Sequence, residues 1–415
     1  MDKDYGISLK AIQKKAENTV NDLQKTGRAV INNTIDDIQL VLGGISECLK
    51  EVDKIRIRAI HRAIEYHTLY QRSMIEAGIL RVDLIDKVWE KVFGKIEGNA
   101  NPKIYQLRNP KQAVWSNSKP IMIPINLDSH TFPQRRAPYL FVHGAGKRGN
   151  EEEAFDFYEQ FELNAKMFNN SNHDYSSSDI YIVSYDSLIT NNTKLIIKDA
   201  FESVLGTLSD SDAPLLFTAV VWREWEKRAE ETAEKVILPF MRKMSESGIE
   251  APRLGAGAIT HSLGCYALSH AAQLFVSEIP EPSLRPFSFW FCMAAALPSN
   301  AFTSTGQFPL APLIAGRPYQ DNLFYGTSVW FSNLDATLGV LYSILANRYF
   351  SMGQTGSLVS KEDLVNLDVT RCSGLEHDYP IYFKLVKNVI RSALGTEVWS
   401  EQPHCELKLP TIKIE

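Results

Sequence analysis

The pattern of apolar and polar positions changes character twice along the 415-residue chain. Up to about residue 100, apolar residues such as Leu9, Ile12 and Ala16 recur at helical spacing, and the first proline is Pro102. This spacing predicts several amphipathic helices. From residue 139 onward, short apolar runs alternate with helical stretches, which is typical of a mainly parallel sheet covered by helices.

Together with a polar C-terminal stretch, these changes predict four regions. A helical N-terminal region covers 1–100, and a proline-punctuated linker with short extended pieces covers 101–138. An α/β domain covers 139–395, and a C-terminal tail covers 396–415. The predicted fold class is therefore α/β, with a mainly parallel central sheet, helices on both faces and an additional N-terminal all-α region. We interpret that region as a helical cap or bundle; a partner-binding or self-associating module and a membrane-surface helix are the alternatives.

Individual elements follow from the same pattern. Strands are expected at 139–142, 179–185, 254–260, 287–295 and 328–332, and helices at 151–168, 193–208, 225–244, 338–346 and 381–394. A short extended piece is expected at 120–125. Two further segments, 187–224 and 298–327, are candidates for a lid over an apolar pocket. The apolar run 215–222 within the first is equally well interpreted as a buried core element.

A sharp turn at a serine joins a strand to a helix near residue 262. Strand character ends at Thr260, Ser262 stands at the turn, and helical spacing resumes after Gly264. Strand, turn and helix in this order form a nucleophile elbow, which holds the serine side chain above the sheet. Gly264 suits the close approach of helix and strand. Thr260 stands where the common motif has its first glycine, so the motif here is Thr-x-Ser-x-Gly.

A glycine-rich turn, Phe141-Val-His-Gly-Ala-Gly146, directly follows the first expected strand of the domain. It can present the backbone N–H of Gly144 or Ala145 toward the elbow. With the N–H of Leu263, such a group would form an oxyanion hole, which stabilises the charge that develops in acyl transfer. A phosphate-binding loop is a poor alternative, because the spacing differs and Lys147 is not followed by Ser or Thr.

An acid and a base are expected in loops farther along the chain. Asp335 lies just past a late strand, where a buried carboxylate could orient a histidine. Capping of the following helix is the alternative role, and the two roles can coexist. His377 lies in a loop before the last helix. The rivals for these two positions are Asp186, Asp321, Asp378 and His404.

His261 precedes the candidate nucleophile directly. At an elbow its side chain points away from that of the serine, so we predict a packing role for it.

These residues resemble the α/β-hydrolase superfamily, and in particular its lipase- and esterase-like members. The resemblance covers 139–395 and rests on His143-Gly144, the His-Ser-Leu-Gly elbow and the His377-Asp-Tyr379 loop, in the chain order serine, aspartate, histidine. It implies a Ser262–His377–Asp335 triad, a covalent acyl-enzyme, and neither cofactor nor metal. The expected activity is hydrolysis of lipid-like or other apolar carboxylic esters.

Alternatives to this activity remain open at the level of sequence. One is a phospholipase of the effector or toxin type, whose helical region serves assembly or delivery. Another is a non-catalytic scaffold of the same fold. Amidase and acyltransferase activity use the same residues, because a triad does not choose its acyl acceptor.

Composition limits the partners. The chain is 44% apolar and 22% charged, as in ordinary globular proteins, and its net charge of −5 gives no reason to expect nucleic acid. Five scattered cysteines predict neither a disulfide framework nor a metal site. Without a signal peptide or an apolar stretch of membrane-spanning length, a cytoplasmic protein is expected; signal-independent export and peripheral membrane contact are the alternatives.

Overall fold

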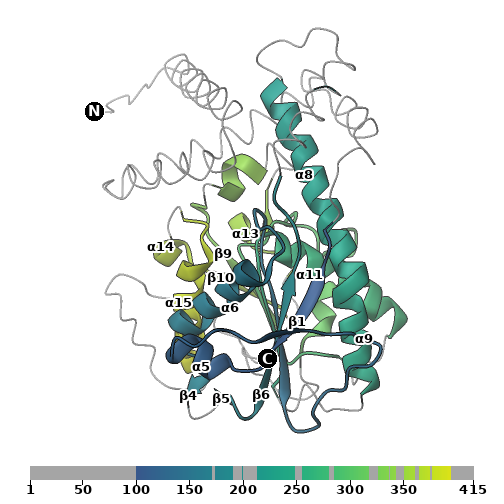
Figure 1. The fold of residues 1–415 in the computed structure, drawn as a ribbon. Helices are drawn as coiled ribbons and strands as arrows, with labels where there is room; N and C mark the ends of the chain where they lie inside the picture. Colours follow the sequence, from purple (N-terminus) through teal and green to yellow (C-terminus); the bar gives the residue numbers. More distant parts are fainter. Residues whose placement is uncertain are drawn as a thin grey trace, which may run out of the picture. The chain divides into compact units, whose positions relative to one another are not determined.

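The computed structural model describes residues 100–170, 173–189, 199, 213–247, 255–279, 285–316, 326–335, 337–342, 350–359, 364–373 and 376–393 (Figure 1). The expected N-terminal helices, the helix at 193–208 apart from residue 199, and the C-terminal tail lie outside these residues. The chain divides into two compact units. The larger comprises 98–188, 224–338 and 350–415, and the smaller comprises 1–97, 189–223 and 339–349.

The larger unit is built on an eight-stranded sheet whose strand order is β10-β9-β8-β7-β3-β6-β1-β2. Its strands are β1 (Lys103–Leu107), β2 (Met122–Pro124), β3 (Ala137–Val142), β6 (Ser178–Ser184), β7 (Gly257–His261), β8 (Phe289–Met293), β9 (Gly326–Phe331) and β10 (Leu364–Asp368). Every pairing from β6 across to β10 is parallel, whereas β1 pairs antiparallel with β6 and β2. A separate pair, β4 (Asn169–Asn170) and β5 (His173–Asp174), is antiparallel.

The central strands are buried along their whole length. In β3, β6, β7 and β8 every residue is buried, which explains their near-continuous apolar sequences. A strand that faced water on one side would alternate apolar and polar residues instead. The sequence therefore encodes a sheet that is covered on both faces.

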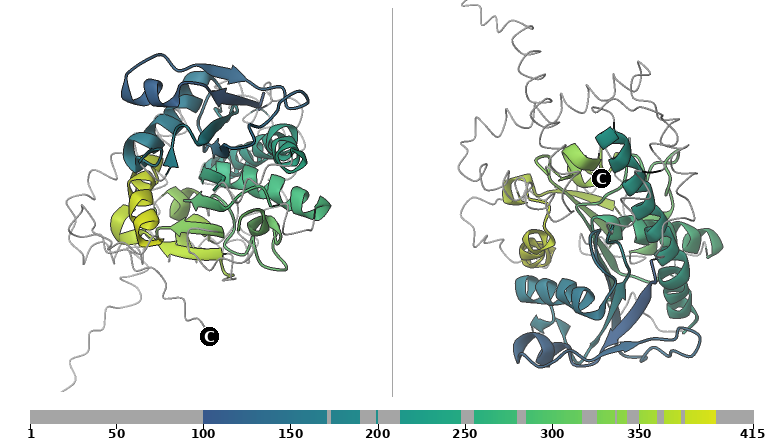
Figure 2. Two further views of the ribbon diagram at one scale, coloured as in Figure 1. Left: turned by 90° about the horizontal axis from the view of Figure 1, so that it is seen from below. Right: turned by 45° about the horizontal axis from the view of Figure 1, so that its top comes forward.

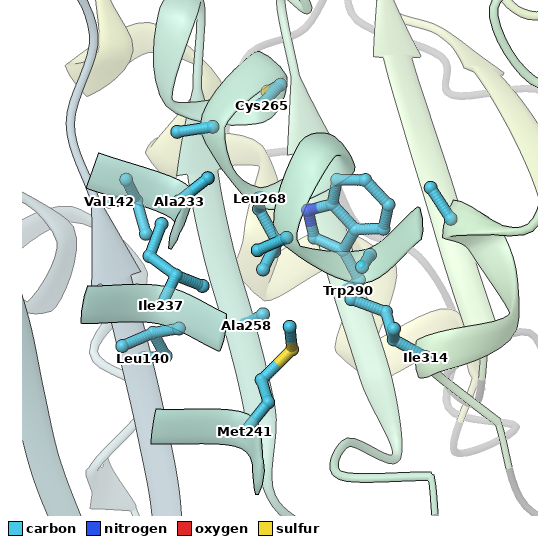
Figure 3. Close-up of a cluster of buried hydrophobic side chains, with 14 of the residues drawn as sticks. Leu140, Val142, Ala233, Ile237, Met241, Ala258, Cys265, Leu268, Trp290 and Ile314 are labelled. Atoms are coloured by element: carbon cyan, nitrogen blue, oxygen red, sulfur yellow. The ribbon is translucent and has the colours of Figure 1, made fainter. Parts of the chain in front are cut away.

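Helices cover both faces of the sheet (Figure 2). Strand β3 shows how the faces divide. The ring of Phe141 lies 5.1 Å from the rings of Tyr158 and Phe161 on α6 (Glu151–Ala165). On the other face, Leu140 and Val142 join a buried cluster with side chains of the π-helix η1 (Ala233–Ile237), α9 (Leu238–Glu246) and α11 (Leu263–Glu278) (Figure 3). Helix α15 (Tyr379–Ala393) packs against α6.

The strand order reverses at β3. The chain runs from β3 outward to β6, and then returns to place β7 on the opposite side of β3. The helices that follow β3 and β7, α6 and α11, accordingly pack on opposite faces. In open α/β sheets such a reversal creates a crevice at the carboxyl ends of the strands, where ligands bind. The loops after β3 and β7 are the ones that carry the expected oxyanion turn and the expected nucleophile.

The predicted α/β class with a mainly parallel sheet is confirmed. The five expected strands correspond to β3, β6, β7, β8 and β9, and the extended piece at 120–125 contains β2. Strands β1 and β10 were not predicted. Both are edge or near-edge strands with polar residues in their sequences, so the apolar-run signal is weak in them.

The two segments considered for a lid, 187–224 and 298–327, are each described in part. Much of 298–316 is core: Phe302, Phe308 and Ile314 are buried, and the short helix η3 (Ala311–Ile314) packs along α11. The apolar run at 215–222 belongs to α8 (Ala213–Thr232), which is helical throughout. In the smaller unit, Trp222 of α8 is buried and its ring lies 5.1 Å from that of Tyr342.

Shorter helices complete the described structure, namely α5 (Pro110–Trp115), α13 (Met352–Thr355), α14 (Thr370–Ser373) and the π-helix η4 (Thr337–Tyr342). Among the helices that the structure describes, none combines the length and the apolar character that a membrane span requires. Cys265 and Cys292 are free, whereas Cys372 is disulfide-bonded, which the scattered cysteines did not predict.

Candidate active site

Ser262 occupies a strained turn between β7 and α11. Its backbone has φ 53° and ψ −120°, a region that non-glycine residues rarely adopt. The turn is held from β8, because the N–H of Ser262 donates to the carbonyl of Met293 at 3.0 Å. Such strain costs on the order of 1–3 kcal/mol and persists only where the surrounding structure imposes it. The geometry has the features expected of a nucleophile elbow.

Gly264 allows the elbow to form. A Cβ at this position would lie 2.3 Å from the carbonyl oxygen of Val142 and 2.5 Å from that of His143. Both distances are far inside van der Waals contact. The first turn of α11 therefore touches the backbone that leaves β3, and only a glycine fits there.

The side chains of Ser262, His377 and Asp335 form one line of hydrogen bonds. The Ser262 Oγ lies 3.0 Å from His377 Nε2, and His377 Nδ1 lies 2.8 Å from Asp335 Oδ2. Ser262 follows β7, Asp335 follows β9, and His377 lies in the loop before α15. The fold thus brings together three residues that are up to 115 positions apart in the chain.

Asp335 is fully buried and has a partner for each carboxylate oxygen. Its Oδ1 accepts the backbone N–H of Leu338 at 2.9 Å, so it caps the turn that begins η4. Its Oδ2 accepts from His377 Nδ1 and, at 3.4 Å, from the hydroxyl of Tyr382. The capping role and the contact with His377 coexist, because different oxygens serve them.

Asp335 changes the proton affinity of His377. Burial is the largest single effect and would lower the pKa of the imidazole. The negative charge of Asp335, its hydrogen bond and the charge of Asp378 together outweigh burial and raise that pKa above its ordinary value of 6.5. A raised pKa means that His377 accepts a proton more readily. This is the property that a base next to a hydroxyl requires.

The glycine-rich turn after β3 lies against the elbow. A Cβ on Gly144 would be 2.9 Å from the Cβ of Ser262. The carbonyl of Gly144 faces the other way: His143 Nδ1 lies 2.8 Å from it, and the Ser187 hydroxyl donates to it at 3.3 Å. Because the C=O and N–H of a trans peptide point in opposite directions, the N–H of Ala145 points away from these groups.

Tyr185 supports the same turn from the end of β6. Its hydroxyl donates to the carbonyl of His143 at 2.9 Å, and its ring stacks on the imidazole of His143 at 4.5 Å. His143 Nε2 accepts the N–H of Tyr185 at 3.4 Å, which leaves Nδ1 to donate to Gly144. Burial lowers the pKa of His143 to about 4, so the ring is neutral and this tautomer is fixed.

Leu263, the third residue expected at an oxyanion hole, is the first residue of α11. Its N–H is one of the helix-terminal groups that have no partner within a helix. The positive end of the helix dipole lies at the same point and favours an anion there.

The rival residues are placed elsewhere. Asp186 Oδ1 accepts the N–H of Leu188 at 2.9 Å and lies 3.5 Å from Arg228 Nη1. Asp378 is exposed. Asp321 and His404 lie outside the described residues. Among the considered carboxylates that the structure describes, Asp335 is the one within hydrogen-bond distance of His377.

Two residues of the site were not recognised from sequence. Tyr185 stands at the end of an apolar strand, where an aromatic residue is most simply core. His261 was assigned to packing, and its ring is indeed buried, but its Nε2 also lies 2.7 Å from the backbone carbonyl of His377. The position of His261 directly before Ser262 was the signal in the sequence that could have indicated a role for His261 in the site.

No group of three His, Cys, Asp or Glu side chains is placed to hold a metal ion within the part of the chain that the structure describes. No protein-family model matches this chain, and the comparison with curated proteins finds no match.

Proposed function

We propose that this protein is a serine hydrolase of the α/β-hydrolase superfamily, which cleaves carboxylic esters through an acyl-enzyme. The observation that carries the proposal is the hydrogen-bonded line from Asp335 through His377 to Ser262, with distances of 2.8 and 3.0 Å. An eight-stranded, mostly parallel sheet flanked by helices is compatible with that superfamily.

In the proposed reaction, the Ser262 oxygen attacks the ester carbonyl while its proton passes to His377 Nε2. Asp335 holds the imidazole in the required tautomer and stabilises the imidazolium. The N–H groups of Leu263 and Ala145 stabilise the oxyanion. Collapse expels the alcohol, which takes the proton from His377. Water, activated by the same histidine, then releases the carboxylic acid and restores the serine.

The strain at Ser262 supports an enzyme over a non-catalytic scaffold of the same fold. A scaffold has no use for a serine held at φ 53°, in a turn where glycine would be unstrained. Strained backbone tends to persist where function requires it. The same reasoning supports a nucleophile at this position rather than a buried polar contact.

The substrate is proposed to carry an apolar acyl group, an expectation that rests on the candidate lid segments 187–224 and 298–327. A series of p-nitrophenyl esters from acetate to palmitate tests this part separately. Activity confined to acetate and butyrate, without binding to phosphatidylcholine vesicles, would reject the lipid-like substrate and leave the ester hydrolase in place.

The test of the reaction is labelling with a fluorophosphonate probe, which reacts with activated serines. Peptide mass spectrometry is expected to find one adduct, on Ser262. Ser262→Ala should abolish the adduct, and His377→Ala should reduce its rate by at least about 10²-fold. Ser277→Ala, at the far end of α11, is the control. Ser187→Ala would not serve, because Ser187 contacts the turn at Gly144. A folded protein that gives no adduct would contradict the proposal.

A further inference from the structure

His261 connects the strand that carries the candidate nucleophile to the loop that carries the candidate base. It is the last residue of β7 and directly precedes Ser262. Its Nε2 lies 2.7 Å from the backbone carbonyl oxygen of His377, which is 116 positions away in the chain. The contact is thus a bridge between a strand and a loop that approach each other only in the folded protein.

The position of the proton on His261 follows from its partner. A carbonyl oxygen can only accept, so Nε2 must carry the hydrogen. The ring is 4% exposed, and burial, followed by the proximity of His377, lowers its pKa well below 6.5. His261 is therefore neutral, with its proton on Nε2 and an unprotonated Nδ1.

We propose that His261 is a positioning residue, whose Nε2–H anchors the His377 carbonyl and so keeps the catalytic imidazole aligned between Ser262 and Asp335. The inference rests on the proposed function, because it assigns His261 a role in that reaction. It concerns a contact made by the ring of His261 and not the reacting atoms themselves.

The alignment matters because His377 must satisfy two partners at once. Its two ring nitrogens lie 3.0 Å from Ser262 and 2.8 Å from Asp335, so a small rotation of the loop would lengthen at least one contact. His377 lies in a short irregular segment before α15. A backbone anchor at the same residue limits that rotation directly, whereas contacts at neighbouring residues would act only through flexible torsions.

Neutrality of His261 also matters for the reaction. Its ring centroid lies 4.9 Å from that of His377. A positive charge at this distance would oppose formation of the His377 imidazolium. Other described groups around His261 include the rings of Tyr379 and Tyr382, at 5.8 and 5.9 Å, and Lys147, whose charge also disfavours protonation of His261.

Simple packing is the alternative role for His261, since its buried ring lies close to the rings of His377, Tyr379 and Tyr382. The two roles predict different behaviour for two substitutions. Gln carries an amide nitrogen at the ε position and can donate to the same carbonyl. Met fills a similar volume but has no donor. Packing alone predicts that Met serves at least as well as Gln, whereas anchoring predicts that Gln restores what Met loses.

The experiment compares wild type, His261→Met, His261→Gln and, as a matched control, His130→Met. His130 is a partly buried histidine that contacts Tyr181, outside the proposed site. Kinetics with a p-nitrophenyl ester give kcat and KM. Proton NMR of the full chain follows the far-downfield Nδ1–H resonance of His377, which reports its bond to Asp335 without any turnover.

We expect His261→Met to lower kcat by about 10- to 100-fold with KM changed less than about twofold, because slight misplacement of a catalytic group costs this much. The Nδ1–H resonance should broaden or disappear. His261→Gln should restore kcat to within about fivefold of the wild-type value. The Nδ1–H resonance should be visible again in this variant. His130→Met should change neither.

Two results would overturn the inference. In one, His261→Met retains the wild-type kcat and the Nδ1–H resonance of His377. In the other, His261→Met and His261→Gln lower kcat and weaken that resonance to the same extent. If the wild type cleaves no ester and takes up no fluorophosphonate, the proposed function fails, and the NMR comparison still decides whether His261 holds His377. Thermal unfolding of each variant verifies that the compared proteins are folded.

Discussion

The indole N–H of Trp290 donates to the hydroxyl of Thr260 at 2.8 Å, in the core beneath the elbow. Thr260 is the residue that stands in place of the usual first glycine. Its hydroxyl lies between β7 and β8, 3.2 Å from the carbonyl of Phe291 and 3.1 Å from Cys265 Sγ. The site accepts a threonine because the fold provides partners for the hydroxyl, and Trp290 in turn depends on it.

Replacing Thr260 with Val should destabilise the protein while keeping its shape. Val matches Thr in volume but leaves the buried Trp290 N–H without an acceptor, which costs about 1–3 kcal/mol. Urea unfolding of Thr260→Val should show this loss of unfolding free energy, whereas Thr260→Ser, which keeps the hydroxyl, should lose less. Equal stability of Val and wild type would contradict the importance of this contact.

The reactivity of Ser262 should fall in acid through the titration of His377. The pKa of His377 is raised above 6.5 because the hydrogen bond to Asp335 and the charges of Asp335 and Asp378 outweigh the effect of burial. The imidazole accepts the serine proton only when it is neutral. Fluorophosphonate labelling should therefore be full above that pKa and fall as the pH decreases through a midpoint above 6.5. Measuring labelling rates between pH 5 and 9 gives the midpoint.

Asp335→Asn should shift that midpoint downward, because the charge that raises the His377 pKa is removed. It should also lower the plateau rate, on the order of 10³- to 10⁴-fold, since an amide no longer favours the required tautomer. Asp368→Asn, an exposed residue whose carboxylate accepts the N–H of Thr370 at 2.9 Å, is the matched control. A midpoint unchanged in Asp335→Asn would count against the assigned acid.

Tyr185→Phe should impair the reaction through the oxyanion turn. The substitution keeps the ring stacked on His143 but removes the hydroxyl that holds the His143 carbonyl at 2.9 Å. We expect kcat to fall about tenfold with little change in KM, because the turn stabilises the transition state more than the bound substrate. Tyr175→Phe, which removes a hydroxyl bonded to Glu162, should leave kcat unchanged. If Tyr185→Phe retains the wild-type kcat, the hydroxyl of Tyr185 does not support the oxyanion turn in the reaction.

The strands were predictable where burial is complete. An apolar run such as that of β7 is recognisable by itself because both its faces are covered. Strand β1 was not, because its sequence Lys-Ile-Tyr-Gln-Leu lies in a proline-punctuated stretch and its pairing with β6 depends on residues far along the chain. Propensity weakens as a guide where tertiary contacts decide.

The candidate site shows a similar division. Chain order and loop position led to Ser262, Asp335 and His377, because these signals are local or follow from the topology of a parallel sheet. The bond from His261 to the His377 carbonyl could not be foreseen, since it requires knowing how the end of β7 faces a loop far along the chain. The support of the Gly144 turn by Tyr185 depends likewise on the pairing of β3 with β6.

Glu162 offers a test of the core that does not involve the candidate site. This carboxylate on α6 is fully buried, with its oxygens accepting from the Tyr175 hydroxyl at 2.9 Å and the Phe168 N–H at 3.1 Å. Burial raises its pKa from 4.5 to about 7, although these hydrogen bonds partly oppose the shift. The folded protein therefore binds a proton at Glu162 more tightly than the unfolded chain does.

The fold opposes ionisation of Glu162. The raised pKa therefore lowers the unfolding free energy only at pH values at which Glu162 is ionised in the unfolded chain. The cost is absent below about pH 4.5, grows with rising pH and is complete above about pH 7. Gln does not ionise, so the unfolding free energy of Glu162→Gln should rise relative to wild type between pH 5 and 8, by up to about 3 kcal/mol. Urea unfolding at pH 5 and at pH 8, with Glu152→Gln at an exposed position of the same helix as control, measures the difference. A constant difference at the two pH values would contradict a buried carboxylate that titrates near neutrality.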